Sequence, residues 1–320
     1  MIKKIFTLLA FTFLTPVIAS DDGEKLNTHT QRIFSGVTKI SINNICGNIF
    51  FDVREDPDQK VIIKAEGNIQ DFFKGNYFKE DYSFKMRKNV LVIKSKDLRR
   101  ETEILSSIRL RDRRGLENNE LMPLFKITAP KKCKLSIVSA YMVHIKQLNA
   151  YLNAHIYGME AELKVDQLKA GGSIILSGGS TCCVKDVSGK SFQSHIFGDN
   201  DISIKNINVD TAYFSMNTRN YDEEEKLTSL IRTMNIKQGN VRNLNVNICH
   251  YPTEKRIELL EFCFLGQAKY ANLTCYGKGS IHINKVEKRV RKNCLIGGKV
   301  TIDNKPSYKS SKKHQDATTQ

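Results

Sequence analysis

Apolar and polar residues recur along the chain with a period close to 20 residues. The pattern apolar-x-x-apolar occurs four times in one phase, at 145–148, 165–168, 184–187 and 204–207. A glycine recurs in step with it, at Gly158, Gly178 and Gly198, each after a short apolar run. A period of this length, built from strand-like runs and turn residues, is too short for pairs of helices. It favours a parallel β-solenoid, in which each repeat stacks on the previous one.

Alternation within the strand-like runs predicts which side chains face the interior, because successive side chains of a strand point to opposite faces. Two columns of aligned residues are uniformly apolar and are assigned to the core: Val143, Leu163, Cys182, Ile202 and Ile145, Val165, Val184, Ile204. The column between them points outward: His144, Lys164, Cys183 and Ser203. The next outward columns hold amides and charged residues, which can hydrogen-bond from repeat to repeat.

The sequence therefore predicts an all-β chain forming a single-stranded parallel β-helix, or β-solenoid, with about 20 residues per coil. An N-terminal strand cap and an inserted loop or short helix complete the expected fold. The expected divisions are a signal peptide at 1–20, a linker at 21–33, a solenoid domain at 34–210, its degenerate continuation at 211–304 with the insertion at 217–233, and a disordered basic tail at 305–320.

Residues 1–20 have a short basic start, an apolar run and residues with small side chains before the expected cleavage site. This pattern is typical of a secretory signal peptide. A membrane anchor is the alternative. However, the apolar run is short for a span, and acidic residues follow it rather than a basic stop. We therefore expect an exported protein, in the periplasm, on the outer surface or secreted, with no transmembrane segment after cleavage.

The formal net charge of the 320-residue chain is +16, and 26% of its residues are charged. Loss of Lys3 and Lys4 with the signal peptide leaves a strongly basic protein. Such a charge favours anionic partners, and for an exported chain these are an anionic polysaccharide or a cell-envelope surface. Nucleic acid is not expected as a partner of an exported chain.

Several stretches resemble a known family. They are "FSGVTKISINNICGNIFFDV", "VIIKAEGN", "NVLVIKSKD" and "FKITAPK", followed by repeats of the form "SGGSTCCVKDV" and "FGDNDISIKNI". Their order and spacing resemble the autotransporter adhesin head domain called the GIN domain, over about residues 34 to 210. The resemblance implies a bacterial, exported β-helical domain with an adhesive role.

An aromatic strip is the main candidate binding site. His155 and His195 occupy equivalent outward positions two repeats apart, and Tyr157 and Phe197 occupy the next outward column, with Ser177 between them. On a basic surface such rings could stack on sugars or on partner side chains. The alternative is that the N-terminal strands or the insertion cover them, since large aromatic side chains are more often buried.

The sequence supports catalysis and metal binding less well than it supports a binding surface. His155 and His195 would lie roughly 9 to 10 Å apart at their bases, too far for one zinc ion, so no metal or other cofactor is expected. Asp199 and Asp201 follow Gly198, where a tight turn requires such residues. The chain is therefore expected to be a non-catalytic, adhesin-like binding protein. The alternative is a β-helical polysaccharide lyase or hydrolase, which would need paired carboxylates or a Ca²⁺ site.

Two further features remain open. The block at 94–114 is rich in Lys and Arg and is either a solvated loop or an electrostatic contact with an anionic surface. Cys275 and Cys294 are 19 residues apart in aligned repeats, which predicts a disulfide between neighbouring coils. The alternative is that both are small buried thiols. Cys182 and Cys183 point to opposite sides and should not bond to each other.

Overall fold

The computed structural model describes residues 30–55, 58–66, 82–95, 124–157, 161–198, 200–217, 230–250 and 258–304. The predicted signal peptide, most of the block at 94–114, most of the insertion at 217–233 and the basic tail at 305–320 lie outside these residues. Within them the chain is all-β. None of the described residues belongs to a helix long and apolar enough to cross a membrane.

The strands in chain order are β1 (Thr30–Phe34), β2 (Lys39–Arg54), β3 (Val61–Glu66), β4 (Tyr82–Arg87), β5 (Val90–Ser95), β6 (Leu124–Pro130), β7 (Lys134–Leu148), β8 (Leu152–Tyr157), β9 (Glu162–Leu168), β10 (Gly172–Ser177), β11 (Thr181–Phe197), β12 (Asp201–Asn217), β13 (Leu230–Cys249), β14 (Glu258–Tyr276), β15 (Gly279–Leu295) and β16 (Lys299–Asn304).

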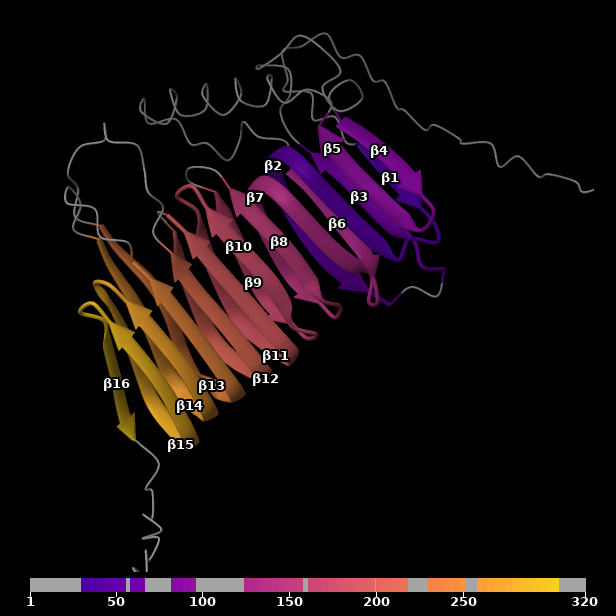
Figure 1. Cartoon of the computed structure of the whole chain (residues 1–320). Helices are drawn as coiled ribbons and strands as arrows, with labels where there is room; N and C mark the ends of the chain where they lie inside the picture. The colour runs from indigo at the N-terminus through magenta and orange to yellow at the C-terminus, as the bar shows by residue number, and fades with distance from the viewer. Residues whose placement is uncertain are drawn as a thin grey trace, which may run out of the picture.

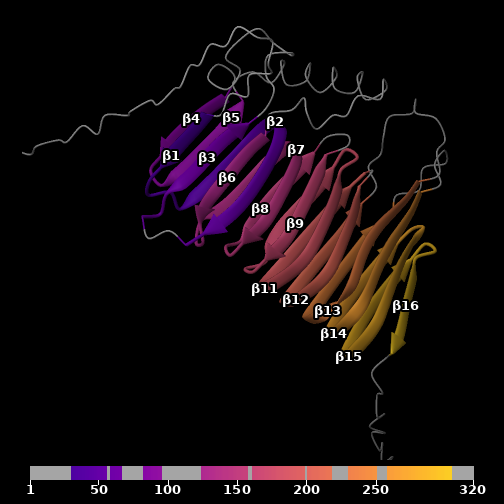
Figure 2. The same cartoon turned by 180° about the vertical axis from the view of Figure 1, so that it is seen from behind.

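These strands form one large, mostly parallel sheet that is not closed (Figure 1). The antiparallel pairs within the described residues are β1 with β3, β3 with β6 and β4 with β5, all at the N-terminal end. From β7 onward the strands follow one another along the molecule in chain order, as the change from magenta to yellow shows in Figure 2. The finer prediction of a β-solenoid stays a prediction.

The register confirms the period read from the sequence. β11 pairs with β12 at a constant step of 20, from Thr181 with Asp201 to Phe197 with Asn217. Steps of 19 and 20 relate β9 and β10 to β11. The step rises to 32 between β12 and β13, and the additional residues fall at 218–229, outside the described part of the chain. Both predicted apolar columns are buried, and Cys183 is exposed, as alternation predicts.

The long strands bend, so that each contributes to two faces of the molecule. Face A is defined by the segments 152–157, 172–177, 192–197, 212–217, 244–249 and 271–276. Face B is defined by the segments 162–168, 181–187, 201–207, 233–238 and 261–265. The rings of Phe214 from face A and Phe262 from face B lie 5.2 Å apart, so the two faces pack on a common apolar core.

We expect Cys275 and Cys294 to form a disulfide in the oxidised protein. The structure confirms their predicted register, because Cys275 of β14 pairs with Cys294 of β15. Adjacent strands lie about 4.8 Å apart, within the Cα separation that a disulfide tolerates. Both are free thiols in the structure, Cys275 buried and Cys294 exposed, so the bond itself stays a prediction. Mass spectrometry of a non-reduced digest should detect the linked peptides, whereas two unlinked thiols after air oxidation would contradict the bond.

Candidate functional site

The outward positions of face A carry uncharged side chains throughout six neighbouring strands. On β8, β10 and β11 they are Asn153, His155, Tyr157, Ser173, Ile175, Ser177, Gln193, His195 and Phe197. On β12, β13 and β14 they are Tyr213, Ser215, Asn217, Asn245, Asn247, Cys249, Asn272, Thr274 and Tyr276. None of these eighteen positions holds Lys, Arg, Asp or Glu, and all of them except Ser177 and Ser215 are at least partly exposed.

This neutrality is unexpected in a chain of which 26% of the residues are charged. Charged residues are those most often found at the surface, so an outward-facing area of this extent would ordinarily contain several. Face B shows the ordinary behaviour, with one outward column of Lys146, Asp166, Lys185, Lys205 and Lys237. The two sides of the same core therefore differ sharply in charge.

The structure separates the aromatic strip from the lysine column. The aromatic residues lie on face A, whereas the lysine column lies on face B. On face B, Lys185 Nζ lies 2.7 Å from Asp166 Oδ1, and His144 Nε2 lies 3.0 Å from Asp166 Oδ2. Burial raises the pKa of Asp166, but its hydrogen bonds with Lys185 and His144 outweigh burial and lower the pKa overall. Sequence reasoning could not separate the two sides because it did not locate the bend between them.

The structure places the four predicted strip residues in the expected register. His155 pairs through Ile175 with His195, and Tyr157 pairs through Ser177 with Phe197. The side chain of Tyr157 is 42% exposed, so it is not a core residue. His155 and Phe197 are half-buried. Their role in binding is a proposal, because register alone does not identify a ligand.

Rings from adjacent positions contact one another on face A. The His195 ring lies nearly parallel to Phe197, with centroids 6.5 Å apart, and 5.3 Å from Tyr213 on the next strand. The His155 and Tyr157 rings are 5.5 Å apart. The Tyr157 hydroxyl donates a hydrogen bond to Asn44 Oδ1 at 2.8 Å, which orients its ring. Tyr213 was missed by the sequence analysis, although its column could be read from the step of 20.

Beyond the rings, face A continues as rows of amides and hydroxyls. Asn245 and Asn247 alternate with buried apolar residues along β13, and Asn272 and Thr274 repeat the arrangement on β14. Amides present both donors and acceptors, and hydroxyls can act as either. The surface can therefore form hydrogen bonds with an uncharged polar ligand, and its rings offer apolar surfaces for stacking. Among the described residues, no group of three or more His, Cys, Asp or Glu side chains could hold a metal ion.

The stability of the protein is expected to fall as the pH drops below about 6.5, through His195. Burial disfavours the charged imidazolium, so the pKa of His195 in the folded protein is lowered from its ordinary value of 6.5. Between those two values the unfolded chain binds the proton more readily than the folded chain. Protonation of His195 therefore does not reduce the free energy of unfolding above about pH 6.5, and it reduces that free energy as the pH falls towards the folded-state pKa.

Urea denaturation at pH 7.5, 6.0 and 5.0 measures this effect. The variant His195→Gln should lose less stability over the same range, because its side chain does not titrate. Parallel losses in the two proteins would contradict the assignment to His195. The lowered pKa also keeps His195 neutral at physiological pH, consistent with the uncharged character of face A.

Comparison with known proteins identifies a shared fold but no family. No family model matches the chain, and no curated protein matches it. A solved structure from Parabacteroides distasonis ATCC 8503, provisionally named a lipid binding protein, aligns with a TM-score of 0.52 at 15% identity over 86% of this chain and 96% of that chain. At this identity the likeness concerns the fold alone.

Two further solved structures align less closely. A provisionally named adhesin from Parabacteroides distasonis ATCC 8503 has a TM-score of 0.46 at 14% identity, over 87% of this chain and 98% of that chain. Another provisionally named adhesin, from Bacteroides fragilis NCTC 9343, has a TM-score of 0.44 at 12% identity, over 88% of this chain and 98% of that chain. Neither alignment is close enough to support an argument about function.

Proposed function

We propose that the protein is an exported, non-catalytic binding protein of the cell envelope, adhesin-like in role, in which a β-solenoid presents face A to a glycan. The observation that carries this proposal is the row of eighteen uncharged outward positions in a chain of net charge +16. A surface that maintains neutrality over six strands, while the opposite side carries a lysine column, is suited to a ligand without charge.

The chemistry of face A favours a glycan among uncharged ligands. Asn and Thr side chains can exchange hydrogen bonds with sugar hydroxyls, and aromatic rings can pack on the C–H faces of sugar rings. The strands lie about 4.8 Å apart and repeat similar groups along the molecule, which suits a polymer of similar units. The anionic envelope surface expected from the net charge would instead meet face B, where the lysine column lies.

The double variant Tyr157→Ala with Phe197→Ala is expected to weaken glycan binding about tenfold or more. Each aromatic contact contributes ~0.5–1.5 kcal/mol beyond its buried area, and 1.4 kcal/mol corresponds to a factor of ten in affinity. Isothermal titration calorimetry with neutral hexasaccharides, such as those of glucose, mannose and xylose, measures the change. The affinity of the natural protein for these glycans should vary little with salt concentration, because neither face A nor the glycan carries charge.

The matched control is Lys205→Ala with Lys237→Ala, which changes two exposed residues of face B. This variant should bind the same glycan with unchanged affinity. Equal weakening by both double variants would contradict the assignment to face A. A loss of several kcal/mol of stability in the aromatic variant would show that the two rings belong to the core. Shortened saccharide products after incubation would instead support the lyase or hydrolase alternative.

A further inference from the structure

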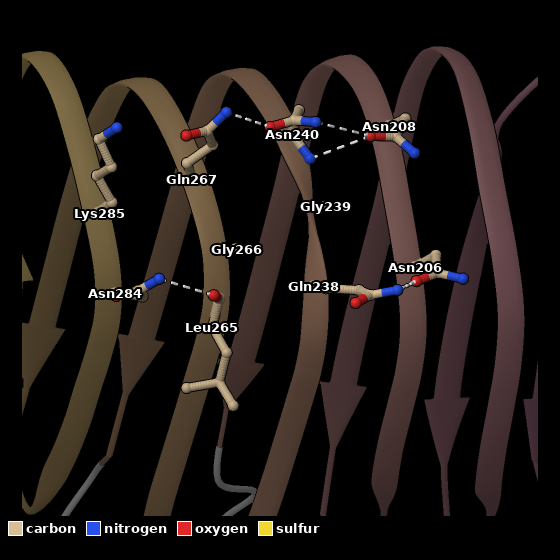
Figure 3. Close-up of a pocket in the computed structure, with 10 residues that line it drawn as sticks. All are labelled: Asn206, Asn208, Gln238, Gly239, Asn240, Leu265, Gly266, Gln267, Asn284 and Lys285. Carbon is tan, nitrogen blue, oxygen red and sulfur yellow. Dashed lines mark hydrogen bonds between the residues drawn. The ribbon is translucent and has the colours of Figure 1, made fainter.

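Two ladders of side-chain amides follow the edge where face B turns into face A (Figure 3). In the first ladder, Asn206 Nδ2 donates to Asp186 Oδ1 at 2.6 Å, and Gln238 Nε2 donates to Asn206 Oδ1. In the second, Asn240 Nδ2 donates to Asn208 Oδ1 at 3.3 Å, and Gln267 Nε2 donates to Asn240 Oδ1 at 2.5 Å. Each amide therefore donates towards the N-terminal end and offers its carbonyl towards the C-terminal end.

Both ladders are interrupted at the same place. After Gln238 the corresponding stretch of β14 is Leu265 and Gly266, neither of which has an amide side chain. The first ladder resumes only at Asn284, which donates to the carbonyl oxygen of Leu265 at 3.0 Å. In the second ladder the register partner of Gln267 is Lys285. A hollow of about 410 Å³ lies at this interruption, lined by residues of both ladders.

The backbone keeps the hollow unfilled. The register step between β13 and β14 falls from 28 to 27 across this edge, and the step between β14 and β15 falls from 19 to 18. Fewer residues therefore span this edge on each successive strand from β13 to β15. The surface is hollowed there as a result. A Cβ atom on Gly266 would lie 2.4 Å from the carbonyl oxygen of Gly239, so no side chain can replace the missing amide at that position.

The hollow presents two acceptors and one cation. No donor among the described residues reaches Oε1 of Gln238 or of Gln267, and Figure 3 shows the Gln267 oxygen directed towards the Lys285 strand. Among the described residues, the carboxylate nearest to the Lys285 ammonium is that of Glu287 at 3.9 Å, and the two side chains are 47% and 40% exposed. The side chain of Leu265 is 50% exposed beside these polar groups.

We propose that this hollow binds a sugar unit bearing a carboxylate, such as a uronic acid. Its hydroxyls would donate to the two glutamine carbonyls, its carboxylate would accept from Lys285, and its C–H surface would pack on Leu265. Lys205 and Lys237 precede Asn206 and Gln238 in sequence and add positive potential near the hollow. The hollow is separate from face A, so this proposal does not depend on the one made for that face.

Titration of the full chain with trigalacturonic acid, monitored by isothermal titration calorimetry, tests the proposal. The neutral trisaccharide of galactose is the comparison ligand. We expect the acid to bind and the neutral sugar to bind at least tenfold more weakly. Lys285→Gln should reduce the affinity for the acid about tenfold or more, because it removes a charge-assisted hydrogen bond. Leu265→Asn, which returns an amide to the interrupted ladder, should reduce it as well.

Two controls make the result specific. Lys278→Gln removes the same charge from an exposed lysine in the turn before β15 and should leave the affinity unchanged. Tyr157→Ala with Phe197→Ala alters face A only and should also leave binding of the acid unchanged. Equal affinity for the acid and the neutral sugar in this face A variant, or equal losses in Lys285→Gln and Lys278→Gln, would overturn the proposal. Loss of binding in the face A variant alone would place the acid on face A.

Discussion

Replacing Phe214 with alanine is expected to lower the free energy of unfolding by about 3–5 kcal/mol. Phe214 is fully buried, and its ring lies 6.0 Å from that of Phe192 and 5.2 Å from that of Phe262. Because Phe262 comes from the opposite face, truncation opens a cavity between the two faces. The surrounding strands are held in register by backbone hydrogen bonds, so the cavity can collapse only partly. Urea denaturation followed by circular dichroism measures the loss.

Tyr213→Ala is the matched control for this core substitution. Tyr213 directly precedes Phe214 on β12, but it points outward on face A and is half-buried. Its truncation should cost less than about 1 kcal/mol, as for most substitutions outside the core. Similar losses in the two variants would show that the inward and outward positions of β12 are not those described. A loss confined to Phe214 would support the alternation on which face A depends.

The strand register of the central repeats could be predicted because two independent markers share one period. The apolar pairs and the glycines both recur at steps of 19 or 20, and a strand shifted by one residue would expose its apolar side chains. For this reason the columns through Val143 and Ile145 were assigned correctly from the sequence. The same reasoning placed Cys275 opposite Cys294 near the C-terminal end.

The neutral surface could not be predicted in the same way, although the sequence does show which of its residues alternate along a strand. The stretch Asn243 to Ile248 alternates amides with apolar residues, which indicates a strand with a polar outer side. Which outward columns share a surface depends on where each long strand bends, and no residue type marks that position consistently. The sequence alone therefore did not show whether the rings near His195 and the lysines near Lys185 share a surface, whereas the structure places them on two.

The hollow at the edge could not be predicted from the sequence, for a related reason. It results from changes of a single residue in the register steps at β13 to β15, and such changes are smaller than the variation already present in the repeat. Gly239 and Gly266 would have been the only signals. An isolated glycine in a strand indicates a bulge or a close backbone approach, but not its consequence for the surface.

Replacing Gly239 with alanine is expected to destabilise the protein by about 3 kcal/mol or more, from the combined costs of backbone strain and overpacking. Gly239 has a φ of +140°, which side-chain-bearing residues rarely adopt. A Cβ atom there would lie 1.9 Å from the carbonyl oxygen of Ile207, a backbone atom that cannot move without disturbing β12. Thermal and urea denaturation measure the effect.

Gly36→Ala separates the two causes. Gly36 also has a positive φ, of +68°, but a Cβ atom there would meet nothing within 4 Å, so only backbone strain remains. Its expected cost is about 1–2 kcal/mol. Equal losses in the two variants would contradict the close contact between Gly239 and Ile207. Because Gly239 also lines the hollow, Gly239→Ala should abolish binding of trigalacturonic acid even at temperatures where the variant is still folded, whereas Gly36→Ala should bind it normally.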